Sequence, residues 1–319
     1  MLLITGATGF LGKNLIPHLA KKYRLRALVR RTSTISFLKD IHNVEIAYGD
    51  LEHNEGLEQA LIGIETVVHC AARTIGKNAV EYYKTNTVGT AHVVEAMAKQ
   101  GVKKILYLSS HAACGPCARN EPHHEIITPL PISFYGASKK RAEDIIQKST
   151  LEYIILRPVA VYGPHDTETL KYIRLMKQGL CPIIGYGEKY LNLIYVEDLV
   201  HLIGIILEKN KFNNTVHFAN DGHCYSFREI ADAIMRALRR RCITFHIPEH
   251  AALFCGLLND VFLPGRKRLV WRDKVRELAQ QYWLCRTDTL KTAYPFEPGF
   301  TLEQGMEKTI AWYKKHGCL

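Results

Sequence analysis

The sequence lacks any long hydrophobic run, although 47% of its 319 residues are apolar. A membrane-spanning helix needs ~20 consecutive apolar residues, and no stretch of the chain approaches that length. The first apolar run begins at Leu2, which leaves no space for a positively charged leader followed by a cleavage site. We therefore expect a cytoplasmic protein that does not span a membrane.

The cysteine spacing that would build a disulfide framework is also missing. The nine cysteines are an odd number without regular spacing, which favours free thiols in a reducing compartment. Cys114-Gly115-Pro116-Cys117 spells the thioredoxin redox motif, but a loop-like sequence follows it where thioredoxins begin a helix. His123-His124-Glu125 has no further ligand at a spacing that would complete a metal site. We predict neither thiol–disulfide exchange nor a metal site, and the sequence leaves open whether Cys114 and Cys117 pair.

Acidic residues are scarce relative to basic ones. The chain has 42 Lys and Arg against 31 Asp and Glu, which gives a formal net charge of +11. Such a charge suits nucleic acid, an anionic ligand or a membrane surface. The basic residues are spread along the chain except at 239–241 and 266–268, so we predict no nucleic-acid binding.

Three glycines follow the first apolar run. Leu2-Leu3-Ile4 is too short for a helix and predicts a buried strand that leads directly into the glycines. Gly6 suits the positive φ of a tight turn, Gly9 lets backbone N–H groups approach a pyrophosphate, and Gly12 lets the next helix pack on the strand. The G-x-x-G-x-x-G spacing is by itself weak evidence for a phosphate site.

Strand and helix patterns then alternate five times, which predicts an α/β fold with a doubly wound parallel (Rossmann) sheet. The predicted strands are 2–4, 24–29, 44–48, 66–69 and 105–108, and helices are expected over 10–22 and 79–99. A helix over 226–239, a strand over 243–247 and an apolar segment at 249–263 predict a smaller C-terminal α/β domain. We expect a dinucleotide-binding domain of residues 1–157 with about 190–218, and a substrate-binding domain of residues 158–189 and 219–319.

The residues after the second predicted strand favour NADP over NAD. In an open parallel sheet this position faces the adenosine ribose, where an acid holds the 2′-hydroxyl and a base holds the 2′-phosphate. The chain reads Val29-Arg30-Arg31-Thr32-Ser33, without an acid. We predict that Arg30 binds the 2′-phosphate of NADP, with NAD as the alternative cofactor.

Tyr135 and Lys139 lie four residues apart in a predicted helix that begins at Phe134. They share a helix face, so the ammonium can lie beside the phenol and favour its ionised form. Acid–base catalysis near neutral pH needs the tyrosine pKa lowered from ~10 toward ~7. Ser110 follows the fifth predicted strand, at the same edge of the sheet.

With these motifs in order, the chain resembles the extended branch of the short-chain dehydrogenase/reductase superfamily, also known as the NAD-dependent epimerase/dehydratase family. This branch includes nucleotide-sugar epimerases, dihydroflavonol-reductase-like enzymes and 3β-hydroxysteroid-dehydrogenase-like enzymes. The resemblance covers roughly the first two thirds of the chain, through TGATGFLG at 5–12, GDL at 49–51, HCAA at 69–72, NTVGT at 86–90, LSS at 108–110, YGASK at 135–139, LRPVAVYGP at 156–164 and YVEDLV at 195–200.

The resemblance implies a role for individual residues. Tyr135 would be the acid/base, Lys139 its partner and ribose anchor, and Ser110 the hydroxyl that orients the substrate oxygen. Counting back from Gly115, which matches a family glycine, selects Ser110 over Ser109. The family often forms homodimers through helices that include the Tyr–Lys helix, so we expect a homodimer. The implied cofactor contacts, besides Arg30, are Gly6, Thr8, Gly9, Phe10, Leu11, Gly12, Asp50, Leu51, Ala71, Ala72, Arg73, Asn86, Tyr135, Lys139 and Val159.

Departures from the family pattern bear on the substrate. The 4,6-dehydratases place Asp-Glu after the active-site hydroxyl, where this chain has His111-Ala112. Nucleotide-sugar epimerases place Asn where Ala160 stands and tend to have an arginine where this chain reads Tyr190-Leu191-Asn192-Leu193. Each missing charge-assisted contact is worth roughly 1.5 to 3 kcal/mol, so a nucleotide sugar is disfavoured. His111 and Tyr162 are the candidate substrate contacts.

Three functions are open at this point. The favoured one is hydride transfer between the nicotinamide of NADP and a carbonyl or secondary alcohol of a small molecule, such as a sugar or a sterol-like compound. The alternative is an epimerase like UDP-glucose 4-epimerase with tightly bound NAD. A non-catalytic, redox-sensing NADP-binding protein is the third, and the complete Ser-Tyr-Lys set argues against it.

The apolar segment 249–263 and the basic residues after it allow two interpretations. One is a lid helix packed over the substrate. The other is peripheral contact of residues 249–268 with an anionic membrane, which would admit a lipid-like substrate.

Overall fold

The computed structural model describes residues 1–118, 121–262 and 271–319. The chain clusters into two compact units, termed here the sheet unit and the C-terminal unit. The sheet unit consists of Met1–Ala113, Phe134–Arg157 and Val200–His217, and the C-terminal unit of Cys114–Ser133, Pro158–Leu199 and Phe218–Leu319. The assignment of cofactor to one unit and substrate to the other stays a prediction.

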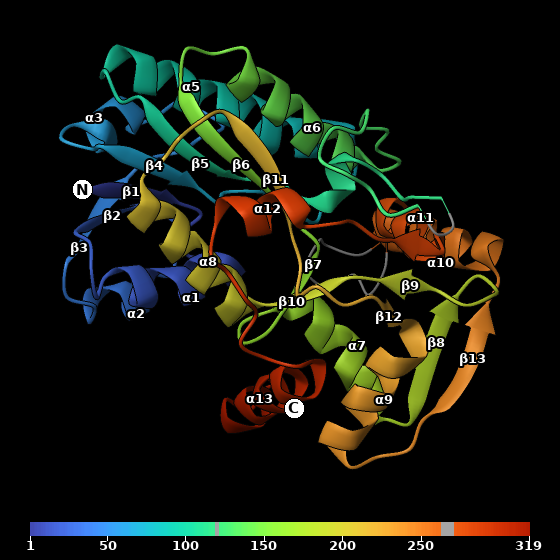
Figure 1. Ribbon diagram of the computed structural model, residues 1–319. Helices are drawn as coiled ribbons and strands as arrows, with labels where there is room; N and C mark the ends of the chain where they lie inside the picture. Colours follow the sequence, from blue (N-terminus) through green and yellow to red (C-terminus); the bar gives the residue numbers. More distant parts are fainter. Residues whose placement is uncertain (119–120, 263–270) are drawn as a thin grey trace. The chain divides into compact units, whose positions relative to one another are not determined.

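A seven-stranded sheet organises the first unit (Figure 1). Its order is β11-β6-β5-β4-β1-β2-β3, and the pairs from β6 to β3 are parallel. This confirms the predicted doubly wound parallel sheet. The strand order reverses between β1 and β4, so the topological switch point follows β1. The strands are β1 (Leu2–Thr5), β2 (Leu25–Val29), β3 (Val44–Tyr48), β4 (Thr66–His69), β5 (Lys104–Leu108), β6 (Glu152–Pro158) and β11 (Thr215–Ala219).

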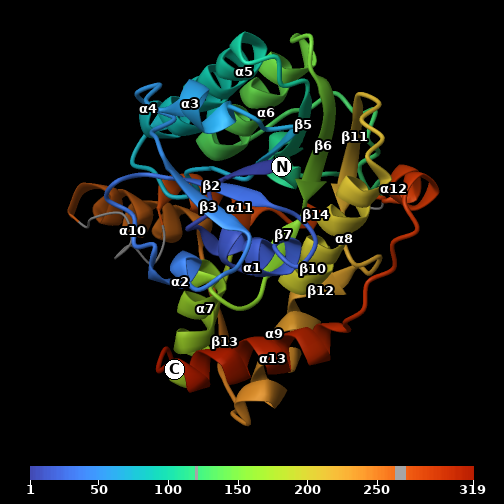
Figure 2. The same cartoon turned by 90° about the vertical axis from the view of Figure 1, so that its left-hand side faces the viewer.

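Helices cover both faces of this sheet. Figures 1 and 2 show α3 (Leu57–Leu61), α5 (Gly89–Lys99) and α6 (Phe134–Gln147) on one face, and α1 (Phe10–Leu19) and α8 (Val196–Lys209) on the other. Apolar side chains of the first three helices pack with β-strand residues such as Val67 and Ile105 into one core. Apolar runs that are buried on both faces are what a parallel sheet requires.

The predicted helix over 79–99 is present but has three parts. It begins as α4 (Ala79–Tyr82), continues as a π-helical segment η1 (Tyr83–Val88) and ends as α5. Such π segments are rare and occur often at functional sites. The short helices α2 (Ser36–Lys39) and η2 (His111–Ala113) complete this unit.

The C-terminal unit contains three small sheets and six helices within the described residues. β7 (Ala160–Tyr162) pairs with β10 (Leu193–Tyr195), and β8 (Leu180–Ile184) pairs with β13 (Ile243–Ile247), each in parallel. β9 (Tyr190–Leu191) lies between β12 (Tyr225–Ser226) and β14 (Tyr282–Trp283). The helices are α7 (Thr167–Lys177), α9 (Phe227–Leu238), α10 (Glu249–Phe262), α11 (Arg272–Ala279), α12 (Asp288–Ala293) and α13 (Leu302–Lys315).

The patterns read from the sequence agree with these C-terminal elements at 227–238 and 243–247. Capping boxes start two of the helices, with Ser226 and Glu229 at α9 and Thr301 and Gln304 at α13. Among the helices of residues 1–118, 121–262 and 271–319, none is long and apolar enough to cross a membrane.

Candidate active site

The turn between β1 and α1 requires glycine at two positions. Gly6 has a φ of 70°, and a Cβ there would lie 2.7 Å from the backbone nitrogen of Ala71. A Cβ at Gly12 would collide with the carbonyl oxygens of Gly6 and Ala7. No side chain in the described part of the chain caps α1 at Gly9, so the first N–H groups of the helix are available to a ligand. The turn fits a dinucleotide pyrophosphate, which needs close backbone approach and a helix N-terminus.

Residues around this turn and after β2 are accessible. Thr8, Phe10 and Leu11 are partly exposed, and Arg30 is exposed directly after the last residue of β2. The guanidinium carbon of Arg31 lies 5.3 Å from the ring centroid of Tyr48, the last residue of β3. Because Arg30 directly follows β2 and is exposed, it supplies a positive charge at the carboxyl edge of the sheet.

Asp50 follows β3 and organises the next turn. Its Oδ1 accepts a hydrogen bond from the backbone N–H of Glu52 at 2.7 Å, and its Oδ2 lies 3.4 Å from Nδ1 of His53. Burial acts to raise the pKa of Asp50, but these contacts outweigh it and hold the pKa below its ordinary value. The carbonyl oxygen of Leu51 accepts a hydrogen bond from Nδ1 of His92 at 2.6 Å.

Asn86 fixes the loop that follows β4. Its Oδ1 accepts a hydrogen bond from the backbone N–H of Arg73 at 2.7 Å, and its Nδ2 donates to the carbonyl of Arg73 at 3.0 Å and to Oγ of Ser138 at 2.9 Å. The backbone N–H of Ala71 donates to Oγ1 of Thr5 at 3.2 Å. With only 1% of Asn86 exposed, its amide joins this loop to α6. A direct contact between Asn86 and a cofactor stays a prediction.

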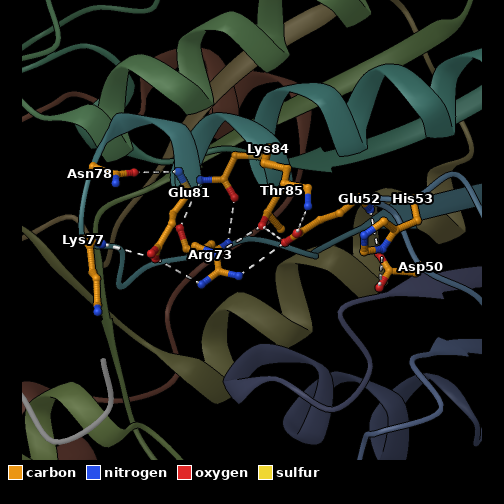
Figure 3. A network of polar contacts seen from close by, with 10 residues as sticks. Asp50, Glu52, His53, Arg73, Lys77, Asn78, Glu81, Lys84 and Thr85 are labelled. Atoms are coloured by element: carbon orange, nitrogen blue, oxygen red, sulfur yellow. Dashed lines mark hydrogen bonds and ion pairs between the residues drawn. The ribbon is translucent and has the colours of Figure 1, made fainter. Parts of the chain in front are cut away.

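The side chain of Arg73 lies between two glutamates (Figure 3). Its Nη2 is 3.3 Å from Oε1 of Glu52, its Nη1 is 3.5 Å from Oε2 of Glu81, and its Nε donates to Oγ1 of Thr85 at 3.2 Å. Burial acts to raise the pKa of Glu52, but the contacts with Thr85, Arg73 and Lys84 outweigh it and lower the pKa. The network joins the segments after β3 and β4 to α4 and η1. Ala72, the neighbour of Arg73, is exposed.

Ser109 and Ser110 follow β5, and the two serines contact different partners. Ser109 is buried and its Oγ donates to Oε1 of Glu143 at 2.5 Å. Glu143 is also held by Arg157, with 2.7 Å between Nη2 and Oε2. Ser110 is partly exposed, and its Oγ accepts a hydrogen bond from the backbone N–H of Ala112 at 3.1 Å. A hydroxyl that accepts in this way can still donate to a substrate oxygen.

Lys139 is a buried amine beside the end of β5. Its Nζ donates to the carbonyl oxygen of Leu108 at 2.5 Å and lies 4.2 Å from the ring centroid of Tyr107. Burial lowers the pKa of Lys139 to about 7, against a smaller opposing effect of Glu143. Lys139 is thus held next to the residues that lead into Ser109 and Ser110.

Tyr135 lies in the first turn of α6 and is partly exposed. Its ring centroid is 6.2 Å from that of Tyr82. α6 packs against η2, which begins directly after Ser110. Ser110, Tyr135 and Lys139 therefore come from neighbouring elements of the sheet unit.

Sequence reasoning assigns no role to Tyr107, Glu143 or Arg157, and it selects Ser110 over Ser109. Glu143 lies four residues after Lys139 on α6, and this spacing was the available signal for it. The contact of Glu143 with Arg157 joins α6 to β6, so it depends on the tertiary fold.

Other predicted residues are buried or lie in the C-terminal unit. His111 is buried in the sheet unit, and Val159 and Tyr162 are buried in the C-terminal unit. The ring of Tyr162 lies 5.5 Å from that of Tyr195, and a Cβ on Gly305 would collide with it. Contacts of His111 and Tyr162 with a substrate, and of Val159 with a cofactor, stay predictions.

Three further predictions concern the cysteines, a metal site and the segment 249–268. None of the nine cysteines, all of which lie in the described residues, forms a disulfide bond, so Cys114 and Cys117 do not pair. Within the ranges that the structure describes, no group of three or more His, Cys, Asp or Glu is arranged to hold a metal ion. The predicted membrane segment 249–268 is described only in part, because its basic residues 266–268 lie outside the described residues.

The parallel sheet and the glycine turn define a Rossmann-type dinucleotide-binding enzyme. The chain belongs to the NAD dependent epimerase/dehydratase family, whose model matches residues 2–219. It is an NAD(P)-dependent enzyme of the dehydrogenase/reductase or epimerase type.

Relatives of both reaction types match over nearly the whole chain. Ceramide reductase of Caulobacter vibrioides is 29% identical in an alignment of 323 positions that covers 99% of this chain and 95% of the relative. UDP-glucose 4-epimerase of Vibrio cholerae is 29% identical over 329 residues, covering 97% and 94%. The decarboxylating sterol-4-alpha-carboxylate 3-dehydrogenase of Mus musculus is 24% identical over 335 residues, covering 96% and 89%.

Solved structures share the fold. The crystal structure of gox2253 superposes with a TM-score of 0.82 at 26% identity and covers 100% of this chain and 99% of that one. The UDP-glucuronic acid 4-epimerase of Bacillus cereus, solved in complex with NAD, has a TM-score of 0.79 at 20% identity, with 99% of each chain covered.

Proposed function

We propose that this protein is an NADP-linked oxidoreductase that transfers a hydride between nicotinamide and a carbonyl or secondary alcohol. The observation that carries the proposal is the placement of Lys139, whose Nζ is held on the carbonyl of Leu108, two residues before Ser110 and on the same helix as Tyr135. When bound, the cofactor supplies or accepts the hydride. The glycine turn fits it because Gly6 and Gly12 let the backbone turn tightly into the N-terminus of α1, which no side chain at Gly9 caps.

The chain's own residues handle the oxygen and its proton. In the direction of reduction, Ser110 donates a hydrogen bond to the carbonyl oxygen, and Tyr135 transfers its phenolic proton to that oxygen as the alcohol forms. A positive charge on Lys139 favours the ionised form of Tyr135 that results. Oxidation reverses these proton movements.

A substrate without a diphosphate is favoured by residues of the C-terminal unit. Ala160 is exposed and offers no hydrogen bond from its side chain. The amide of Asn192 is buried and occupied by backbone, since its Nδ2 donates to the carbonyl of His223 at 2.6 Å and its Oδ1 accepts from the N–H of Cys285 at 2.7 Å. The similarity to ceramide reductase over 99% of this chain supports a lipid-like carbonyl or alcohol.

The second candidate is an epimerase that oxidises and re-reduces a sugar carbon with tightly bound NAD. The equal identity to UDP-glucose 4-epimerase, 29%, favours it. An epimerase purifies with stoichiometric cofactor and shows no net consumption of NADPH, whereas a reductase consumes NADPH.

The proposal also includes a homodimer formed through the surface of α6 and a cytoplasmic location. Light scattering tests the homodimer, and cell fractionation tests the location.

The test is oxidation of NADPH by the purified protein with a panel of long-chain and polycyclic ketones, and with UDP-galactose as the epimerase substrate. We expect Tyr135→Phe to lower kcat by about a hundredfold or more because it removes the transferred proton. Tyr153→Phe, a tyrosine change in β6, is the matched control and should leave kcat near that of the wild type. Unchanged turnover of a ketone by Tyr135→Phe would refute the assigned role, and epimerised UDP-galactose without net NADPH loss would favour the second candidate.

A further inference from the structure

α10 carries its large apolar side chains on its exposed side. The exposed fractions range from 38% at Leu257 to 74% at Phe262. The positions follow the i, i+3, i+4, i+7, i+8 spacing that places side chains on one helical face. These residues, termed the apolar face of α10, are Phe254, Leu257, Leu258, Val261 and Phe262.

The opposite side of α10 consists of small residues and packs against α11. Ala252 and Gly256 are buried, and a Cβ on Gly256 would lie 2.9 Å from the backbone nitrogen of Arg272, the first residue of α11. An ordinary surface helix buries its large apolar residues and exposes polar ones. α10 has the reverse arrangement, so its packing against α11 does not explain the apolar face.

Three of the four carboxylates of this helix pair are largely buried, whereas Glu249 at the start of α10 is exposed. Only 8% of the Asp260 side chain is exposed, and its Oδ2 lies 3.2 Å from Nε of Arg272. Asp273 is buried, and Glu277 lies 3.1 Å from Nζ of Lys274. Arg272 and Arg276 are exposed.

Basic residues also dominate the sequence around these helices. Residues 263–270 add Arg266, Lys267 and Arg268 and no acid, in a chain of formal net charge +11. Two copies of the chain each carry this positive net charge, which disfavours their association. An anionic lipid surface would complement the positive charge of the chain.

We propose that the apolar face of α10 docks on an anionic lipid bilayer, with the helix lying in the interface. An interfacial helix inserts an apolar face among the acyl chains while basic residues contact the lipid headgroups. The 14 residues of α10 are too few to span a bilayer. Docking would give the protein access to a substrate dissolved in the membrane; this last step rests on the proposed function, whereas the docking itself does not.

The experiment is vesicle co-sedimentation of the full-length protein. The vesicles consist of phosphatidylcholine alone or of phosphatidylcholine with phosphatidylglycerol. We expect binding to the anionic vesicles that weakens at high salt, and about tenfold weaker partitioning for Val261→Glu, which places a charge in the apolar face. Val80→Glu is the matched control, because Val80 is similarly exposed, at 72% against 63% for Val261, and lies on α4 in the sheet unit.

The outcomes separate docking from the other possibilities. Binding of Val261→Glu at the wild-type level, or equal loss in both variants, would overturn the proposal. So would absence of wild-type binding to anionic vesicles, or a wild-type dimer in light scattering that Val261→Glu converts to monomer, which would assign the face to a second copy. NADPH oxidation with a detergent-soluble ketone measures the proposed function separately and should be unchanged in Val261→Glu.

Discussion

At the residue scale, the neighbouring serines Ser109 and Ser110 have different hydrogen-bond partners, and we expect different roles for them. The Oγ of Ser109 is buried on Glu143, whereas the Oγ of Ser110 accepts only a backbone hydrogen bond among its described contacts. We expect Ser109→Ala to lower the free energy of unfolding by about 1–3 kcal/mol, because a buried carboxylate loses its hydroxyl donor. Ser110→Ala should lower kcat and leave stability close to that of the wild type.

Denaturant unfolding and steady-state kinetics on both variants make the comparison. The reverse pattern, with Ser109→Ala catalytically impaired and stable, would assign the substrate hydroxyl to Ser109.

Lys139 makes stability depend on pH. Its pKa is about 7 in the folded protein against 10.5 for an unperturbed lysine, so between these values the unfolded chain binds more protons. Stability from this group therefore rises as pH increases from 7 toward 10.5, and below pH 7 the full cost of burying the charge is present. Lys139→Met removes that cost. The change in the free energy of unfolding caused by this substitution should therefore be more favourable at pH 6 than at pH 9, by about 1 kcal/mol or more.

Urea unfolding at the two pH values measures this difference. Lys140→Met is the control on the same helix, because Lys140 forms a partly exposed ion pair with Asp144. An equal effect of Lys139→Met at both pH values would show that the buried amine is not responsible.

At the scale of the element, β1 to β5 were predictable as short segments rich in apolar residues that end in small or polar residues, whereas β6 and β11 were not predicted. A run such as Leu2-Leu3-Ile4 cannot be an exposed strand, and burial on both faces is typical of a parallel sheet. The prediction of one long helix over 79–99 missed its π segment. Local propensity does not encode that segment, which contains Asn86 and Thr85 and places them against Arg73 and Glu52.

The candidate site also contains residues that the sequence predicts and contacts that it does not predict. Gly6 and Gly12 could be predicted because a backbone constraint permits only glycine, and that constraint is local. The contacts of Glu143 with Ser109 and Arg157 could not be predicted, because they join β5, α6 and β6, which are far apart in sequence. The sequence likewise showed that 249–262 is apolar, but the side of α10 that faces solvent depends on the packing of Gly256 against α11.

At the scale of the whole molecule, we expect the charge of Arg30 to affect how much a bound cofactor stabilises the folded protein. A ligand that binds only the folded protein raises its stability by about 2.7 kcal/mol at a concentration one hundred times its Kd. Since Arg30 is exposed at the end of β2, where the ribose of a dinucleotide lies in open parallel sheets, NADP should raise the melting temperature more than NAD does at equal concentration.

Arg30→Asp should reverse this order, because a carboxylate repels the 2′-phosphate and can accept a hydrogen bond from a 2′-hydroxyl. Thermal melts of both proteins with each cofactor provide the measurement. Arg228→Asp, an exposed arginine on α9 in the C-terminal unit, makes the same change of charge and should keep the wild-type order. If the control also loses the preference, net charge decides the cofactor. If Arg30→Asp alone reverses it, the preference belongs to the position after β2.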